Sequence, residues 1–208
     1  MAYEFERKQR IAVLGGGPGG YEAALTGAQL GAEVTLVERV GVGGSAVITD
    51  VVPSKTLIAT AEATGAIDGV TDLGVRFSLQ NAAGRPVRPD VAVDLGAVNR
   101  RLRALARQQS EDMRANLEQA GVRILVGEGR LDGPGRMVVS TGGGRTAQDL
   151  DEIEADTLVV AVGASPRRLP SAPPDGERIL TWTQLYELDE VPEHLIVCLL
   201  YTSDAADE

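Results

Sequence analysis

The feature that most constrains the fold is a glycine-rich turn between a short, mostly apolar run and a helical pattern. Residues 10–14 (RIAVL) lead directly into GGGPGG, and the alanines and leucines of residues 21–30 then recur at helical spacing. Residues 33–37 (EVTLV) read as a second buried strand. The order strand, turn, helix, strand has the length that a parallel crossover requires, so it predicts an α/β fold with a parallel sheet.

The turn spells Gly15-x-Gly17-x-x-Gly20 at the point where a strand passes into a helix. The first glycine permits the tight turn, the second lets the backbone approach a pyrophosphate, and the third lets helix and strand pack closely. The N-terminus of the helix adds free N–H groups and partial positive charge. Glu38 is spaced to accept hydrogen bonds from ribose hydroxyls. These residues predict a dinucleotide site, and the alternative is a glycine-rich turn in an unrelated α/β protein.

The rest of the chain continues the mixture of helical and strand patterns. A glycine-rich loop leads to Pro53, where a helix can begin, and a long amphipathic pattern covers residues 91–120. The continuous apolar run at 157–162 (TLVVAV) is typical of a central strand covered on both faces. Short strands that suggest a small antiparallel meander are predicted at 122–126, 136–140 and 153–155.

Residues 43–55 (GGSAVITDVVPSK) resemble the flavin-facing segment of the pyridine nucleotide-disulfide oxidoreductase family. In that family the same frame carries two cysteines before Pro-Ser-Lys, whereas Ala46 and Val51 stand at those positions here. Dithiol exchange needs a nucleophilic and a resolving thiol. The resemblance therefore points to a dihydrolipoamide dehydrogenase-like flavoprotein without the redox cysteine pair, similar to NAD(P)H:quinone reductases.

Two later segments extend the resemblance over nearly all of residues 8–197. Residues 157–166 (TLVVAVGASP) resemble the strand and turn that return under the flavin, although Val162 replaces the usual threonine. Residues 177–197 resemble the connector into the nicotinamide domain. The resemblance implies that residues 1–197 form a Rossmann-like FAD-binding domain with a parallel central sheet and a small antiparallel β-meander, incomplete at the start of the NAD(P)-binding domain.

The function that the resemblance implies is an FAD-dependent NAD(P)H oxidoreductase. Hydride passes from NAD(P)H through the flavin to a quinone or a similar small-molecule acceptor, and the cofactor carries the chemistry. In this reading Lys55 lies near the reactive edge of the isoalloxazine, where a cation stabilises charge on reduced flavin; a solvated lysine in a first helical turn is the alternative. A soluble transhydrogenase, a non-catalytic dinucleotide-binding module and a simple NAD-dependent dehydrogenase remain open as alternatives.

The candidate site draws on the glycine turn, the end of the second strand, the flavin-facing segment and the returning strand. Lys55 is the candidate catalytic residue. The cofactor-binding candidates are Gly15, Gly17, Pro18, Gly19, Gly20, Glu38, Arg39, Gly44, Ser45, Lys55, Gly129, Ala161 and Gly163. His194 is assigned a structural or exposed role and Trp182 a packing role, and no metal site is assigned.

Charge and composition limit the partners. The 208 residues include 30 acidic and 20 basic residues, a net charge of −10, and the only basic block is the set of arginines within 100–107. Nucleic acid is therefore not expected as a partner. The charged N-terminus lacks the apolar stretch of a signal peptide, and no apolar run has the length of a membrane span. The chain has one cysteine, Cys198, so it can form no internal disulfide, which is typical of a reducing compartment. We therefore expect a cytoplasmic protein without membrane insertion.

The C-terminus departs from the family pattern. In the family the strand that begins at residues 194–197 continues into a second glycine fingerprint, but residues 198–208 contain no glycine. They resemble the translation of a sequencing adapter, so we expect a non-native tail on a truncated N-terminal portion. We expect the parent to be a homodimer, and the portion alone to be inactive, with an unfinished sheet edge that favours aggregation.

Overall fold

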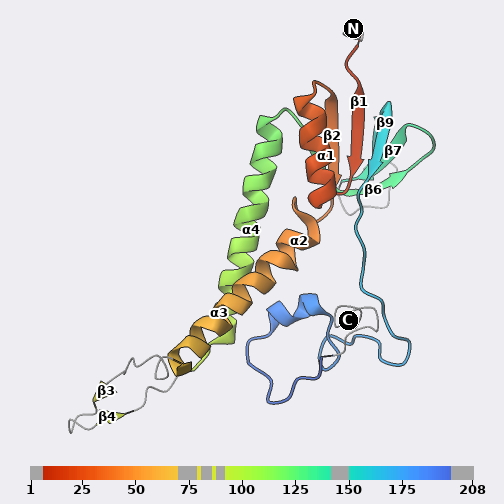
Figure 1. Ribbon diagram of the computed structural model, residues 1–208. Helices are drawn as coiled ribbons and strands as arrows, with labels where there is room; N and C mark the ends of the chain where they lie inside the picture. Colours follow the sequence, from red (N-terminus) through yellow and green to blue (C-terminus); the bar gives the residue numbers. More distant parts are fainter. Residues whose placement is uncertain (1–6, 70–78, 81–85, 88–91, 142–149, 198–208) are drawn as a thin grey trace, which may run out of the picture.

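The computed structural model describes residues 7–69, 79–80, 86–87, 92–141 and 150–197. Its centre is a parallel four-stranded sheet in the order β5-β2-β1-β9 (Figure 1). The strands are β1 (Arg10–Leu14), β2 (Glu33–Glu38), β5 (Arg123–Val126) and β9 (Thr157–Val160). In this register Val13 lies between Leu36 and Val159. All four strands therefore end at one edge of the sheet, and the predicted α/β class with a parallel sheet is confirmed.

One helix crosses over the sheet between β1 and β2. Helix α1 (Pro18–Gln29) starts directly after the glycine turn, earlier than the side-chain pattern predicts, because proline fits the first helical position. The buried face of α1 is made of small residues: Gly20, Ala24 and Gly27. A Cβ at Gly27 would lie 3.2 Å from side-chain atoms of both Ile11 and Val34. The helix backbone therefore packs closely on β1 and β2.

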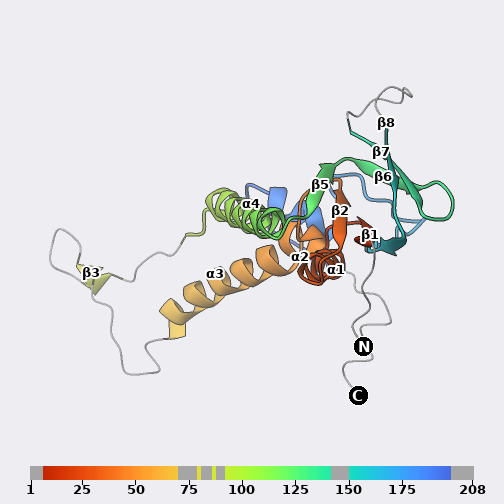
Figure 2. The same ribbon diagram turned by 90° about the horizontal axis from the view of Figure 1, so that it is seen from above.

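A helical arm separates β2 from β5. Its helices are α2 (Gly44–Ile48), α3 (Val51–Gly69) and α4 (Leu95–Gln119). Helices α3 and α4 pack against each other and extend away from the sheet (Figures 1 and 2), with the short antiparallel pair β3 (Leu79–Gln80) and β4 (Pro86–Val87) at the outer end. Asp94 caps α4 by accepting a hydrogen bond from the Ala97 amide at 2.7 Å. None of the helices in the described ranges combines the length and the apolar character that crossing a bilayer requires.

The glycine-rich loop is shorter than the sequence predicts. We expected residues 41–52 to be irregular up to Pro53, but α2 already begins at Gly44 and α3 at Val51. Only Thr49 and Asp50 separate the two helices. Gly43, at φ 100°, makes the left-handed turn that lets a helix start so soon after β2.

The two faces of the sheet are covered by different layers. On one face Val13, Leu36 and their neighbours pack with Ala24 of α1 and Leu117 of α4. On the other face Ala12 and other strand residues pack with Met137, Val139 and Ile153. Adjacent residues of β1 thus serve opposite layers, as the alternation of side chains along a strand requires.

The second layer is the antiparallel meander. The sequence predicts that such a meander exists, but one of the strands assigned to it is wrong. Its strands are β6 (Glu128–Leu131), β7 (Arg136–Ser140) and β8 (Leu150–Glu154). The run at 122–126, expected in the meander, instead pairs with β2 in the parallel sheet. Strand β6 takes its place; its polar sequence EGRL carries little strand pattern.

Two predictions for the last part of the chain are wrong. The run 157–162 was expected to be a central strand, but β9 ends at Val160 and pairs only with β1 among the described residues, so Val162 is 66% exposed. Residues 194–197 form no strand, and Ile196 is 93% exposed. Between them the main regular element is the 3-10 helix η2 (Trp182–Glu187). The predicted non-native tail, 198–208, lies outside the described residues.

Candidate dinucleotide-binding site

The glycine turn after β1 has no room for side chains at its first and third glycines. Gly15 adopts φ 99°, and its amide donates a hydrogen bond to the Val37 carbonyl at 2.8 Å. A Cβ on Gly15 would lie 2.3 Å from the Ala161 carbonyl oxygen, and one on Gly20 would lie 1.8 Å from the Gly15 carbonyl oxygen. Backbone atoms cannot give way at such distances, so the turn requires glycine at both positions.

The second glycine has a different environment. A Cβ on Gly17, or on Gly19, would meet nothing within 4 Å. Gly17 is the N-cap of α1 and offers no side-chain cap, so the first amides of the helix have no side-chain partner. Pro18 follows at the first helical position and has no N–H. The turn therefore presents an open, uncapped helix N-terminus, the arrangement that binds phosphate groups.

Glu38 is bound more tightly to the protein than its sequence position predicts. Its Oε2 accepts from the Gly16 amide at 2.6 Å, and its Oε1 accepts from the amides of Val40 at 2.8 Å and Gly41 at 3.3 Å. A carboxylate has about four lone-pair sites. Three of them are used to hold the glycine turn and the chain after β2 together, and one remains for a ligand hydroxyl.

The second glycine cluster lies against the first. The Gly43 amide donates to the Gly16 carbonyl at 2.7 Å, and a Cβ on Gly44 would lie 2.7 Å from Cα of Gly17. Ser45 is exposed in the first turn of α2. The structure thus brings the glycine turn, Glu38, Gly44 and Ala161 together at the carboxyl edge of the sheet, where ligands bind in open α/β folds.

Other candidate residues lie apart from this cluster or have packing roles. Gly129 lies on β6, and a Cβ there would lie 2.5 Å from Cδ1 of Leu14 and 3.1 Å from Cγ1 of Val37, so the glycine lets β6 pack closely against side chains of the sheet. Arg39 is exposed and lies 3.8 Å from Glu128. Gly163 adopts φ 71°, and a Cβ there would meet nothing within 4 Å.

Lys55 is exposed on α3. Within the described part of the chain it makes no hydrogen bond or ion pair, so its ammonium group is not held by the fold. The sequence prediction that it faces a ligand therefore stays a prediction.

A cavity of about 260 Å³ opens next to Glu38, between the chain after β2 and helix α4. Its wall is largely apolar near the strands and charged along α4. The residues that define it include Glu38, Val40, Ile48, Arg107, Ser110 and Val126.

Two buried residues that sequence analysis did not single out hold the arm. Asn99 of α4 is 1% exposed, and its Nδ2 donates to the carbonyls of Leu188 at 2.7 Å and Leu185 at 3.3 Å. Tyr186 is 7% exposed, whereas Trp182 in the same 3-10 helix is 41% exposed. The available signal was the position of Asn99: it is a polar residue in the stripe that continues through Leu102 and Ala106.

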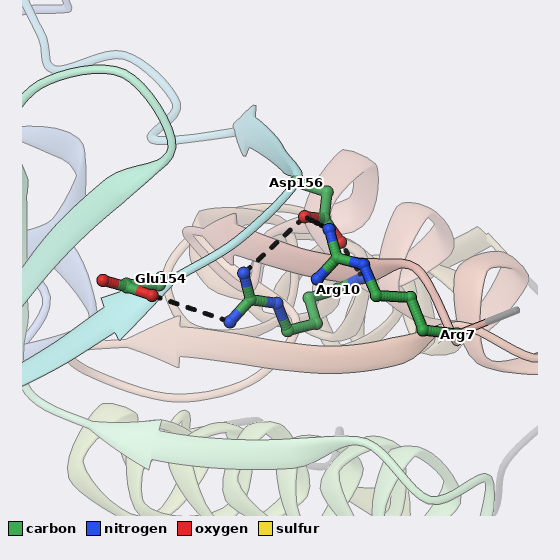
Figure 3. A network of polar contacts seen from close by, with 4 residues as sticks. All are labelled: Arg7, Arg10, Glu154 and Asp156. Atoms are coloured by element: carbon green, nitrogen blue, oxygen red, sulfur yellow. Dashed lines mark hydrogen bonds and ion pairs between the residues drawn. The ribbon is translucent and has the colours of Figure 1, made fainter.

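The opposite end of β1 carries a network of charges rather than a site (Figure 3). Asp156 accepts from the Arg10 amide at 2.9 Å and from the Arg7 guanidinium at 2.8 Å, and Arg10 lies 3.8 Å from Glu154. The Arg10 amide, assisted by the charges of Arg7 and Arg10, holds the pKa of Asp156 below its usual value. The network joins the start of β1 to the turn between β8 and β9.

Comparisons with known proteins agree with this geometry. The family model described as pyridine nucleotide-disulphide oxidoreductase matches residues 9–198. A Mycobacterium tuberculosis protein named NAD(P)H dehydrogenase (quinone) is 44% identical over 197 residues, which cover 90% of this chain and 37% of the relative. A dihydrolipoyl dehydrogenase from Chlorobaculum parvum is 35% identical over 189 residues, with the same coverage of 90% and 37%.

Two solved structures share the fold of this chain. LpdA from Mycobacterium tuberculosis superposes with a TM-score of 0.76 at 41% identity, over 89% of this chain and 38% of that one. The flavoprotein disulfide reductase RclA from Escherichia coli, at 17% identity and a TM-score of 0.66, shares the fold over 89% of this chain and 36% of its own. The chain thus spans about 37% of the length of the curated relatives it matches. Because the family model covers almost all of its residues, the chain belongs to the pyridine nucleotide-disulphide oxidoreductase family.

Proposed function

We propose that residues 1–197 are the FAD-binding portion of an NAD(P)H oxidoreductase that reduces a quinone or a similar small-molecule acceptor. The observation that carries this proposal is the glycine turn, where Gly15 and Gly20 exclude side chains and Gly17 leaves an uncapped helix N-terminus open. The 44% identity to a protein named NAD(P)H dehydrogenase (quinone) supports the choice of acceptor. A homodimeric parent and a cytoplasmic location belong to the same proposal.

The residues of this edge fit a dinucleotide. The open positions at Gly17 and Gly19 leave room for a pyrophosphate against the N-terminus of α1. Glu38 has one acceptor site left for a ribose hydroxyl. The cavity that starts at Glu38 offers an apolar wall to the adenine end. In this proposal Gly44, Ser45 and Lys55 face the other half of the cofactor.

When bound, FAD supplies hydride and electron transfer between NAD(P)H and the acceptor. The chain binds and orients it through backbone amides and Glu38, and Lys55 places a positive charge near the ring that gains electrons. Residues 46 and 51 are Ala and Val, so this segment has no thiol pair to form a disulfide. This supports direct transfer from the flavin to an acceptor in preference to disulfide exchange.

Two measurements test the proposal. The purified chain is mixed with FAD, FMN or NAD, and retained nucleotide is identified by chromatography after desalting; we expect FAD alone to be retained. A longer protein that contains these residues is then assayed with NADH or NADPH and three acceptors: a quinone, a lipoamide disulfide and the other nicotinamide nucleotide. Quinone reduction supports the proposal. Transfer only between nicotinamide nucleotides would favour a transhydrogenase, and FAD binding without any turnover would favour a binding module.

A further inference from the structure

Ser110 of α4 carries a buried hydroxyl that the fold leaves without a partner. The residue is 8% exposed, and it makes no hydrogen bond or ion pair within the described part of the chain. A serine or threonine inside a helix commonly donates to the carbonyl four residues earlier. Thr56, Thr60 and Thr64 of α3 do so at 2.8, 2.9 and 2.9 Å, but Ser110 does not. A buried polar group without a partner needs a physical explanation.

The Ser110 hydroxyl faces the cavity beside Glu38. Helix α4 packs against α2 and β5 (Figure 2), and Ser110 is one of the residues that line the cavity between them. A Cβ on Gly41 would lie 2.9 Å from the Ser110 Oγ. The Gly41 amide also donates to Glu38 at 3.3 Å. The free hydroxyl and the Glu38 carboxylate therefore both lie close to Gly41, and a ligand that reaches one of them is near the other.

The cavity suits a single uncharged ring. Its volume is about 260 Å³, below the roughly 300–1,000 Å³ of pockets that enclose a whole drug-sized ligand. The charges of its lining residues balance, because Glu38 and Glu111 oppose Arg107 and Arg114. The rest of the wall is largely apolar and includes Val40, Val42, Ile48, Ile124 and Val126. A phosphate would find no net positive charge here, whereas a flat heteroaromatic ring would bury apolar surface and need a partner for its polar edge.

We propose that Ser110 is a specificity-determining residue for the base of the bound dinucleotide: its hydroxyl forms a hydrogen bond with the polar edge of the adenine ring. The order of groups along the ligand supports this role. With the pyrophosphate at Gly17 and the ribose at Glu38, the base is the next group and reaches the cavity that Glu38 borders. A hydroxyl both donates and accepts, so it can pair with a ring nitrogen or with the exocyclic amine. The role of Ser110 rests on the proposed function, which supplies the dinucleotide.

The first experiment tests whether the hydroxyl is free in the FAD-free chain. The midpoint of urea unfolding is compared in the unmodified chain and in Ser110→Ala. Alanine has the higher helix propensity and removes a buried polar group that has no partner, so we expect Ser110→Ala to be at least as stable as the unmodified chain. A clear loss of stability would show that the protein itself uses this hydroxyl, and would overturn its assignment to a ligand.

The second experiment measures how much of the binding affinity comes from the base. ADP carries the pyrophosphate, the ribose and adenine, whereas ribose 5-diphosphate lacks only the base. The dissociation constants of both are measured by competition with FAD, whose fluorescence reports its binding. We expect Ser110→Ala to raise the ADP constant about fivefold, through the loss of one neutral hydrogen bond, and to leave that of ribose 5-diphosphate unchanged. Gln109→Ala, at an exposed position of α4 outside the cavity, is the matched control and should change neither.

The outcomes separate the role of Ser110 from the proposed function. If the unmodified chain binds FAD and Ser110→Ala leaves the ADP constant unchanged, the role of Ser110 is wrong and FAD binding stands. Equal weakening of ADP and ribose 5-diphosphate would also overturn the specificity role, because the hydroxyl would then act on the ribose and phosphates and not on the base. Failure of the unmodified chain to bind FAD would overturn the proposed function, and the contact with the base together with it.

Discussion

The two ends of β1 are held by different kinds of contact. At the carboxyl end the backbone of Gly15 and Gly20 packs against carbonyl oxygens at distances that allow no Cβ, and the Glu38 carboxylate bonds three amides. At the amino end Arg7, Arg10 and Asp156 form exposed ion pairs (Figure 3). Backbone packing is short-ranged and insensitive to salt, whereas exposed ion pairs are screened and individually weak.

This difference indicates which end the chain must build accurately. A phosphate site made of backbone amides works only if the turn is fixed to within a fraction of an ångström. The amino end has only to keep β1 in register with β9, so interchangeable charges suffice. Substitutions at the two ends test this contrast, and the largest effect on stability is expected at the carboxyl end.

Gly20→Ala is expected to have the largest effect. The new Cβ would lie 1.8 Å from the Gly15 carbonyl oxygen, so α1 has to move away from β1. Overpacking against backbone costs about 3 kcal/mol in the free energy of unfolding. Urea denaturation of the FAD-free chain measures this free energy of unfolding. Gly19→Ala, on the same helix with open space around its Cβ, is the matched control, and equal stability of the two variants would contradict the close packing.

Glu38→Ala is expected to come second. It leaves the amides of Gly16, Val40 and Gly41 without their carboxylate partner, which costs about 2 kcal/mol because hydrogen bonds to charged groups are the stronger kind. The same denaturation experiment applies, with Glu33→Ala at the exposed start of β2 as control. If both variants have the stability of the unmodified chain, Glu38 does not have the structural role assigned here.

Asp156→Asn is expected to have a smaller effect that depends on pH and salt. The pKa of Asp156 is lowered in the folded state, so its charge stabilises the fold above the unfolded pKa of about 4, and this contribution is lost as pH falls through the folded value. The difference in melting temperature between the unmodified chain and Asp156→Asn should therefore be largest near pH 7, and should shrink on acidification and in high salt. The other carboxylates are the same in both proteins, so their contributions to the pH dependence cancel in this difference in melting temperature. A difference that grows below pH 4 would contradict the assignment.

Much of the carboxyl end could be predicted from the sequence, because glycines at fixed spacing leave few backbone paths. The strand, turn and helix around Gly15 and the α/β class follow from local pattern alone. The membership of the meander could not be predicted, since EGRL in β6 acquires its pairing from β7. Likewise the edge position of 157–160 depends on which strands are available to pair, and a local apolar run does not contain that information.

The site was predicted in outline and incompletely in detail. The spacing of Glu38 predicts a ribose contact, but its three amide hydrogen bonds depend on how the chain turns at Val40 and Gly41. Asn99 and Leu188 are 89 residues apart and meet only through the tertiary fold. A polar residue in an apolar helix stripe, as at Asn99, was the one local sign of that contact.

The most direct test of FAD binding at the glycine turn is the affinity of the Gly17→Ala variant. Its Cβ would meet no protein atom within 4 Å, and alanine is a poorer N-cap than glycine, so the FAD-free chain should lose no more than about 1 kcal/mol of stability. The methyl group would occupy the space proposed for the pyrophosphate, and we expect the FAD dissociation constant, measured by quenching of flavin fluorescence, to rise by about tenfold or more. An unchanged dissociation constant in the folded variant would contradict the account.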